Sequence, residues 1–203
     1  MNANLKFTLS ALALLLTVSA CSLFPDRPAP PALHDFGLSE KATSLQAGCS
    51  AANSGSTASV TAPEWLQTEN IRYRLLYADP TQVRYYTQDR WLASPPAMLA
   101  QRLALACGKN GWRLKISWLA FEQVFDAPHS AKVILVFRAT AQRPASEEIV
   151  AEKLFSLSQP ASTADAKGAV AASEQLVGEA VNALQTWVTE LSDLATGARS
   201  GTN

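Results

Sequence analysis

Few side chains in this chain of 203 residues have the type and spacing that chemistry requires. His34 and His129 lie in unrelated segments without Cys, Asp or Glu at the spacing of metal ligands, so no zinc or iron site is expected. Cys49 could be a nucleophile only with a distant base, and its small, polar neighbours offer nothing that favours the thiolate. The paired carboxylates Glu147 and Glu148 fall in a predicted turn, where exposure to solvent accounts for them. The sequence predicts no catalytic residues, metal or cofactor, and therefore no enzyme.

Motifs and composition exclude further classes. The chain has no Gly-x-Ser-x-Gly elbow, phosphate-binding loop or dinucleotide fingerprint, and only 9 glycines. Its 17 basic residues balance its 17 acidic ones, so it has no surplus of positive charge for nucleic acid. With 48% hydrophobic residues it can form a globular core.

One cysteine has a specific chemical context. Residues 1–20 have a short polar start with Lys6, an apolar run and a small-residue end, the layout of a secretory signal. The end, Val18-Ser19-Ala20-Cys21, resembles the bacterial lipobox. That resemblance implies acylation of the Cys21 thiol and cleavage before it, and two or three acyl chains anchor a protein permanently. Because Ser22, not Asp, follows the cysteine, the sorting convention of Gram-negative lipoproteins implies the periplasmic face of the outer membrane.

The sequence divides into four parts. Residues 1–20 are the expected signal peptide, and residues 21–32 are the acylated cysteine with a proline-rich tether. The 11 residues from Ser22 to Ala32 could hold a domain up to ~34 Å from the bilayer in an extended conformation. Residues 33–195 are the expected domain, and residues 196–203 a flexible tail.

Hydrophobic patterning in the domain predicts one α+β fold, a largely antiparallel sheet covered by two helices, the longer one C-terminal. A hairpin is expected at the turn Ala78-Asp79-Pro80-Thr81. A helix is expected from Pro95, with Ser94 as its N-cap and Leu99, Leu103 and Cys107 on one face, ending at Gly108. The amphipathic helix 165–194 carries the stripe Val170, Val177, Val181, Leu184, Val188 and Leu191. Strands are expected at 33–38, near 60, at 71–77 and 83–86, at 112–125 with a bend near Ala120, at 132–141 and at 149–158.

The remaining two of the three cysteines leave two interpretations open. Export to an oxidising compartment favours a disulfide between Cys49 and Cys107, which would close a loop of about 59 residues and stabilise the fold by ~4 kcal/mol. Alternatively, Cys107 is simply buried on the helix face with Leu99 and Leu103.

A longer segment carries a resemblance to a known family. Ile71-Arg72-Tyr73-Arg74, a second aromatic strand ending Tyr85-Tyr86, and Arg90-Trp91-Leu92-Ala93-Ser94-Pro95-Pro96 before a leucine-rich helix resemble the ABC-type transport auxiliary lipoprotein component family, the PqiC-like lipoproteins. The best-matched positions are Arg90, Trp91, Pro95 and Pro96, for which we expect a role in the turn from sheet to helix. His34-Asp35-Phe36-Gly37 stands where the family has a Tyr-Asp-Leu-Gly-like strand, and Leu92 is an additional residue.

The resemblance implies a non-catalytic lipoprotein. It would work with the permease and ATPase of an ABC transporter and with a mammalian-cell-entry (MCE) type periplasmic protein, moving lipids or other hydrophobic molecules between the two membranes. A structural or envelope-assembly lipoprotein without a transporter is the alternative, and a homo-oligomer stays open.

Overall fold

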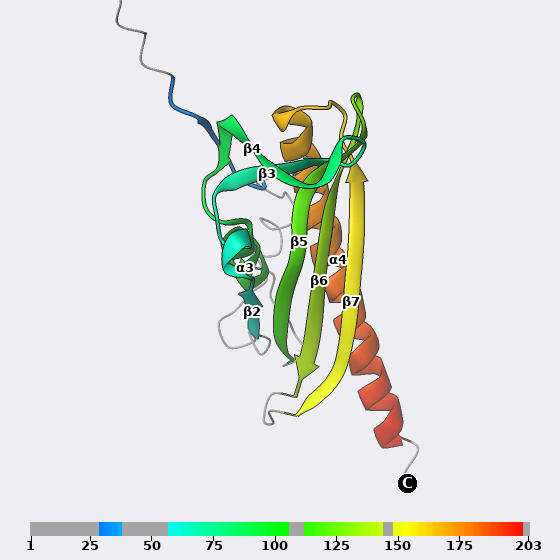
Figure 1. Cartoon of the computed structure of the whole chain (residues 1–203). Coiled ribbons are helices and arrows are strands. Elements are labelled where there is room, and N and C mark those ends of the chain that lie inside the picture. Colours follow the sequence, from blue (N-terminus) through cyan, green and yellow to red (C-terminus); the bar gives the residue numbers. More distant parts are fainter. Residues whose placement is uncertain (1–28, 38–56, 106–111, 144–147, 201–203) are drawn as a thin grey trace, which may run out of the picture. The chain divides into compact units, whose positions relative to one another are not determined.

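Seven strands and two α-helices make up the part of the chain that the computed structural model describes, residues 29–37, 57–105, 112–143 and 148–200 (Figure 1). Residues Pro31–Asn203 form one compact unit. The elements are β1 (Ala32–His34), β2 (Thr57–Thr61), the short 3-10 helix η3 (Glu64–Leu66), β3 (Asn70–Leu75), β4 (Asp79–Trp91), α3 (Pro95–Leu105), β5 (Arg113–Ala127), β6 (Ser130–Gln142), β7 (Ile149–Pro160) and α4 (Ala166–Ser200).

The sheet is mixed. Strands β5, β6 and β7 form an antiparallel meander, and β3 and β4 form an antiparallel hairpin. One edge of β5 receives two parallel neighbours, β2 along its first half and β3 along its last residues. Strand β1 adds in parallel to β4. The α+β class, the single domain and the long C-terminal helix agree with the sequence-based expectation, and the sheet is antiparallel along its longest pairings.

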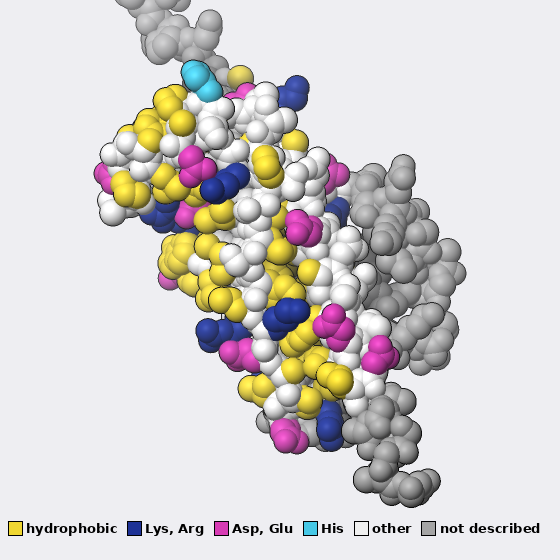
Figure 2. Space-filling model, turned by 90° about the vertical axis from the view of Figure 1, so that its right-hand side faces the viewer, with side chains coloured by type: hydrophobic (Ala, Val, Ile, Leu, Met, Phe, Trp, Pro, Cys, Tyr) yellow, Lys and Arg dark blue, Asp and Glu magenta, His cyan; other side chains and the backbone are white. Residues whose placement is uncertain are grey.

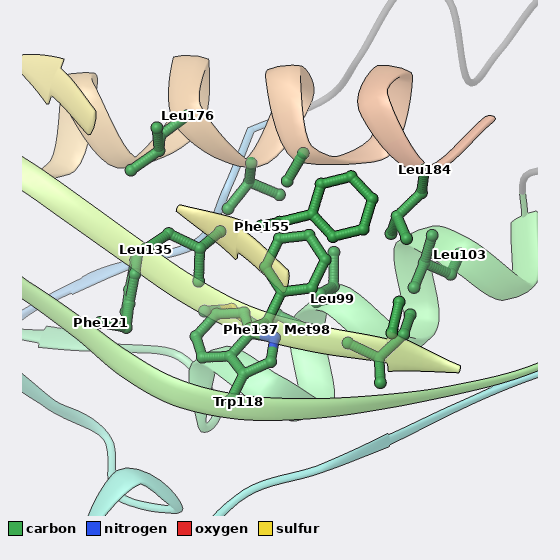
Figure 3. Packing of buried hydrophobic residues seen from close by; sticks show 14 of the residues in the cluster. Met98, Leu99, Leu103, Trp118, Phe121, Leu135, Phe137, Phe155, Leu176 and Leu184 are labelled. Carbon is green, nitrogen blue, oxygen red and sulfur yellow. The ribbon is translucent and has the colours of Figure 1, made fainter. Parts of the chain in front are cut away.

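Both helices contribute to one core on one face of the sheet. The aromatic side chains of Phe137 on β6 and Phe155 on β7 stack with their centroids 4.7 Å apart. Figure 3 shows them between Leu176 and Leu184 of α4 and the α3 side chains Met98, Leu99 and Leu103. In the described part of the chain, no helix covers the opposite face of β5, β6 and β7 (Figure 1).

Helix α4 packs through small residues as well as large ones. Ala169, Ala172 and Ala180 are almost fully buried beside Leu176 and Leu184, and they let the helix approach the sheet closely. The predicted valine stripe is therefore off-centre, since its members at 170, 181 and 191 are only partly buried. The helix continues to Ser200, so residues 196–200 are helical and the predicted tail begins inside α4.

Asp165 explains where α4 begins. Its Oδ1 accepts hydrogen bonds from the Gly168 N–H (2.8 Å) and the Thr163 hydroxyl (2.6 Å), and its carbonyl accepts the Ala169 N–H. This is N-cap geometry. The Thr163 hydroxyl and then the Gly168 amide lower the pKa of the exposed Asp165 carboxyl below its usual value.

The bend expected near Ala120 is a β-bulge. Trp118 pairs with Phe137 and Ala120 with Val136, which leaves Leu119 without a partner on β6 and 42% exposed. Because one residue is inserted, the alternation of buried side chains shifts from Trp118 to Phe121.

Two expected boundaries need correction, the end of the first strand and the position of the hairpin turn. Strand β1 ends at His34, not at residue 38, because the Asp35 carboxylate accepts the Gly37 N–H (2.8 Å) and the chain turns Phe36 into the core. The hairpin turn lies at residues 76–78, not 78–81, since Asp79 already pairs with Leu75 as the first residue of β4.

None of the described helices is both long enough and apolar enough to cross a bilayer.

Candidate functional site

The segment Arg90-Trp91-Leu92-Ala93-Ser94-Pro95-Pro96 forms the junction between β4 and α3. Trp91 closes β4, is 2% exposed, and packs against Phe36 and Phe121 at centroid distances of 5.3 and 6.0 Å. Pro95 is the first residue of α3, and both prolines are buried. The Arg90 side chain is exposed, so it does not join the buried group around Trp91.

Backbone hydrogen bonds tie this junction to the first strand. The Leu92 N–H donates to the His34 carbonyl, and the Trp91 N–H to the Glu69 carbonyl, each at 2.7 Å. Beside them the His34 imidazole Nε2 lies 2.8 Å from Asp89 Oδ1. Strand β1 is thus joined to the end of β4 and to the residue that follows it, just before α3.

A shallow pocket of about 360 Å³ lies over this junction, lined by Leu33, His34, Asp35, Gly37, Leu92, Val170 and Glu174. Gly37 has φ +72°, a backbone conformation that favours glycine, and a Cβ there would meet the flexible end of the Glu174 side chain, with Oε1 at 2.7 Å. Within the described ranges no group of three or more His, Cys, Asp or Glu is placed to hold a metal ion.

A second cluster lies at the junction of β3 and β5, on the face away from α4. Glu122, 10% exposed, accepts the Arg74 Nε–H with both carboxylate oxygens at 2.9 and 2.8 Å. Arg74 Nη1 also donates to the carbonyls of Pro80 and Thr81, which fixes the start of β4 against β3. Its role here is structural.

Arg72 is the unusual member of this cluster. Its side chain is 7% exposed, its Nη2 is 3.9 Å from Glu122 Oε2, and its Nη1 reaches the Trp65 carbonyl only at 3.5 Å. Its buried Nε has no hydrogen-bond partner among the residues that the structure describes. The guanidinium carbon lies 4.6 Å from the ring centroid of Trp65, which is 51% exposed. Two guanidinium groups therefore share one carboxylate, beneath an exposed aromatic ring.

Exposed aromatic and apolar side chains also occur on this sheet. Tyr85 stands directly opposite Arg72 in the antiparallel register and is 49% exposed. Leu119, Val150 and Leu154 are further exposed apolar residues of the meander. Figure 2, which looks onto the β7 side of the molecule, shows hydrophobic side chains mixed with charged ones.

Several predicted site residues lie outside the part of the chain that the structure describes. Cys21, Cys49, Cys107 and Glu147 lie outside the described residues. His129 is exposed in the turn between β5 and β6, and Glu148 is exposed just before β7. The Arg72–Glu122 cluster was not predicted; the only signal in the sequence was the pair of arginines two apart on a strand that otherwise reads as buried.

Comparison with known proteins finds solved structures of similar fold. No family model and no curated protein matches this chain. A crystal structure of a protein from Xanthomonas campestris, of the family model DUF330, aligns with a TM-score of 0.60 and 17% identity over 88% of this chain and 94% of that one. A crystal structure of an uncharacterized protein aligns with a TM-score of 0.59 and 11% identity over 79% of this chain and 99% of that one.

Proposed function

We propose that this chain is a non-catalytic lipoprotein at the periplasmic face of the outer membrane. It would be an auxiliary, PqiC-like component of an ABC transporter that moves lipids or other hydrophobic molecules between the membranes. In this role it docks an MCE-type periplasmic protein. The resemblance around Arg90–Pro96 and the lipobox-like Val18–Cys21 support this, together with a fold shared with a DUF330 protein.

One observation carries the proposal: the resemblance segment is hydrogen-bonded to β1, the first strand after the predicted tether. Strand β1 begins at Ala32 and is bonded to β4 and to Leu92. An anchor at Cys21 would therefore hold the whole domain within ~34 Å of the bilayer through 11 residues. A domain held so firmly and so near a membrane suits an adaptor at the end of a larger assembly.

Fractionation tests the anchor. Wild type is expected in the outer-membrane fraction, and Cys21→Ala in the soluble periplasmic fraction, with Cys49→Ala as the matched control that stays with wild type. If wild type and Cys21→Ala both remain soluble, the anchor is refuted.

Co-purification tests the partner. The domain from residue 29 onward, without the predicted signal and anchor, is expected to retain the MCE-type protein of the same strain. Deletion of the gene is expected to make the cells more sensitive to detergents. If the domain neither binds that protein nor affects sensitivity, the transport role fails and a structural lipoprotein takes its place.

A further inference from the structure

The charges around Arg72 do not balance. Arg72, Arg74 and Glu122 are 7%, 23% and 10% exposed and together carry one net positive charge. Keeping an unpaired charge away from water is costly, and an Arg side chain at such a site normally has its N–H groups satisfied. Among the described residues, the buried Nε of Arg72 has no acceptor, and its other nitrogens make only long contacts. The Arg72 guanidinium can therefore donate to one further acceptor, and an anion there would balance its charge.

A single group satisfies both needs. We propose that Arg72, Trp65 and Tyr85 form a recognition site for a carboxylate of a docked protein partner, an Asp or Glu side chain or a C-terminus. A carboxylate supplies one negative charge and two coplanar acceptors that match the planar guanidinium.

The surroundings favour a protein as the source of this carboxylate. Trp65 and Tyr85 are about half exposed on the same face as Arg72, and Trp, Tyr and Arg are the residue types that dominate the energy of protein interfaces. Trp65 belongs to η3, a turn of three residues, and its ring covers the guanidinium. The carboxylate enters beside this ring, so that Arg72 gains a charge-assisted hydrogen bond and keeps its cation–π contact with Trp65. The nature of the partner rests on the proposed function, whereas the carboxylate site does not.

NMR of the arginine side chains tests the site directly. Sodium acetate is expected to shift the Arg72 Nε–H resonance to a plateau, while sodium chloride at equal ionic strength does not. Arg138, a half-exposed arginine paired with Glu152, serves as the internal control and should show no plateau. Fluorescence gives a second readout, because Trp65 is exposed and the other four tryptophans are at most 6% exposed. Absence of a plateau at Arg72 overturns the proposal.

A substitution sharpens the test. Glu122→Gln removes the carboxylate that competes with acetate for Arg72. The acetate concentration that gives half of the Arg72 Nε–H shift should therefore fall roughly tenfold. The matched control is Glu152→Gln, whose half-exposed carboxylate pairs with Arg138 and whose loss should leave the midpoint unchanged. Equal midpoints in wild type and Glu122→Gln refute the competition.

Two further outcomes separate the alternatives. If dimethyl phosphate binds more tightly than acetate, the site is a phosphodiester site and the carboxylate assignment is wrong. If acetate binds at Arg72 but the MCE-type protein does not co-purify and detergent sensitivity does not change, the carboxylate site stands and the proposed function fails. Co-purification without acetate binding refutes this inference alone.

Discussion

The same Gly→Ala substitution should change stability in opposite directions at two positions of α4. At Gly168 a Cβ would lie 2.0 Å from the Thr163 carbonyl oxygen and 2.7 Å from Thr163 Oγ1, whereas at Gly178 it would meet nothing within 4 Å. Alanine at Gly178 should therefore stabilise the protein by ~0.8–1 kcal/mol through helix propensity. Alanine at Gly168 gains the same propensity but must push the Thr163 turn away by more than ~1 Å.

The cost at Gly168 follows from what that turn does. Moving Thr163 disrupts the Asp165 cap, worth ~1 kcal/mol, and overpacking adds ~1–3 kcal/mol. The net loss is about 1–3 kcal/mol after the propensity gain. For a domain of this size each kcal/mol shifts Tm by ~2–4 °C, so thermal unfolding by circular dichroism should show Gly178→Ala above wild type and Gly168→Ala clearly below it. A Gly168→Ala protein as stable as wild type would refute the close approach of Thr163.

Three further experiments probe the cap, the helix face and the cysteines. Because the pKa of Asp165 is lowered in the fold, its charge stabilises the protein above the unfolded pKa, and that contribution is lost as pH falls through the folded pKa. Denaturant titrations should show that Asp165→Asn lacks the charge contribution at pH 7 and depends less on acid below pH ~4. Asp165→Ala, which also removes the capping oxygen, should lose more stability at pH 7, ~1 kcal/mol. Ala180→Leu, on the fully buried face of α4, should lose ~1–3 kcal/mol by overpacking in the same assay, and an unchanged midpoint would mean that α4 has room there. Thiol labelling of the denatured, unreduced Cys21→Ala protein should find no free thiol if Cys49 and Cys107 are bridged; two labelled thiols exclude the disulfide.

Much of the fold could be predicted because local patterns determine it. Pro95 after Ser94 marked the start of α3, and the changed alternation near Ala120 marked the bulge. The centre of the α4 face was missed, because a search for large side chains passes over alanines such as Ala169 and Ala180, which are buried for their small size.

The same patterns could not predict which strands pair with each other or which charged side chains form ion pairs. Alternation indicates which side of a strand is buried but not its neighbour, so the parallel pairing of β2 with β5 left no local signal. The contact of Arg74 with Glu122 likewise joins residues 48 positions apart and appears only when β3 lies beside β5. The candidate site was therefore only visible in three dimensions.

The mixed sheet has a consequence for the order in which the chain assembles. The β5–β6–β7 meander pairs strands that follow each other along the chain, so its loops close at small entropic cost. Strands β1 and β2 instead pair in parallel with β4 and β5, which are synthesised later and must already be in place to receive them. Slow, non-local steps of this kind govern folding rates. The N-terminal strands of the domain are thus expected to dock last, after β4 and β5 have formed.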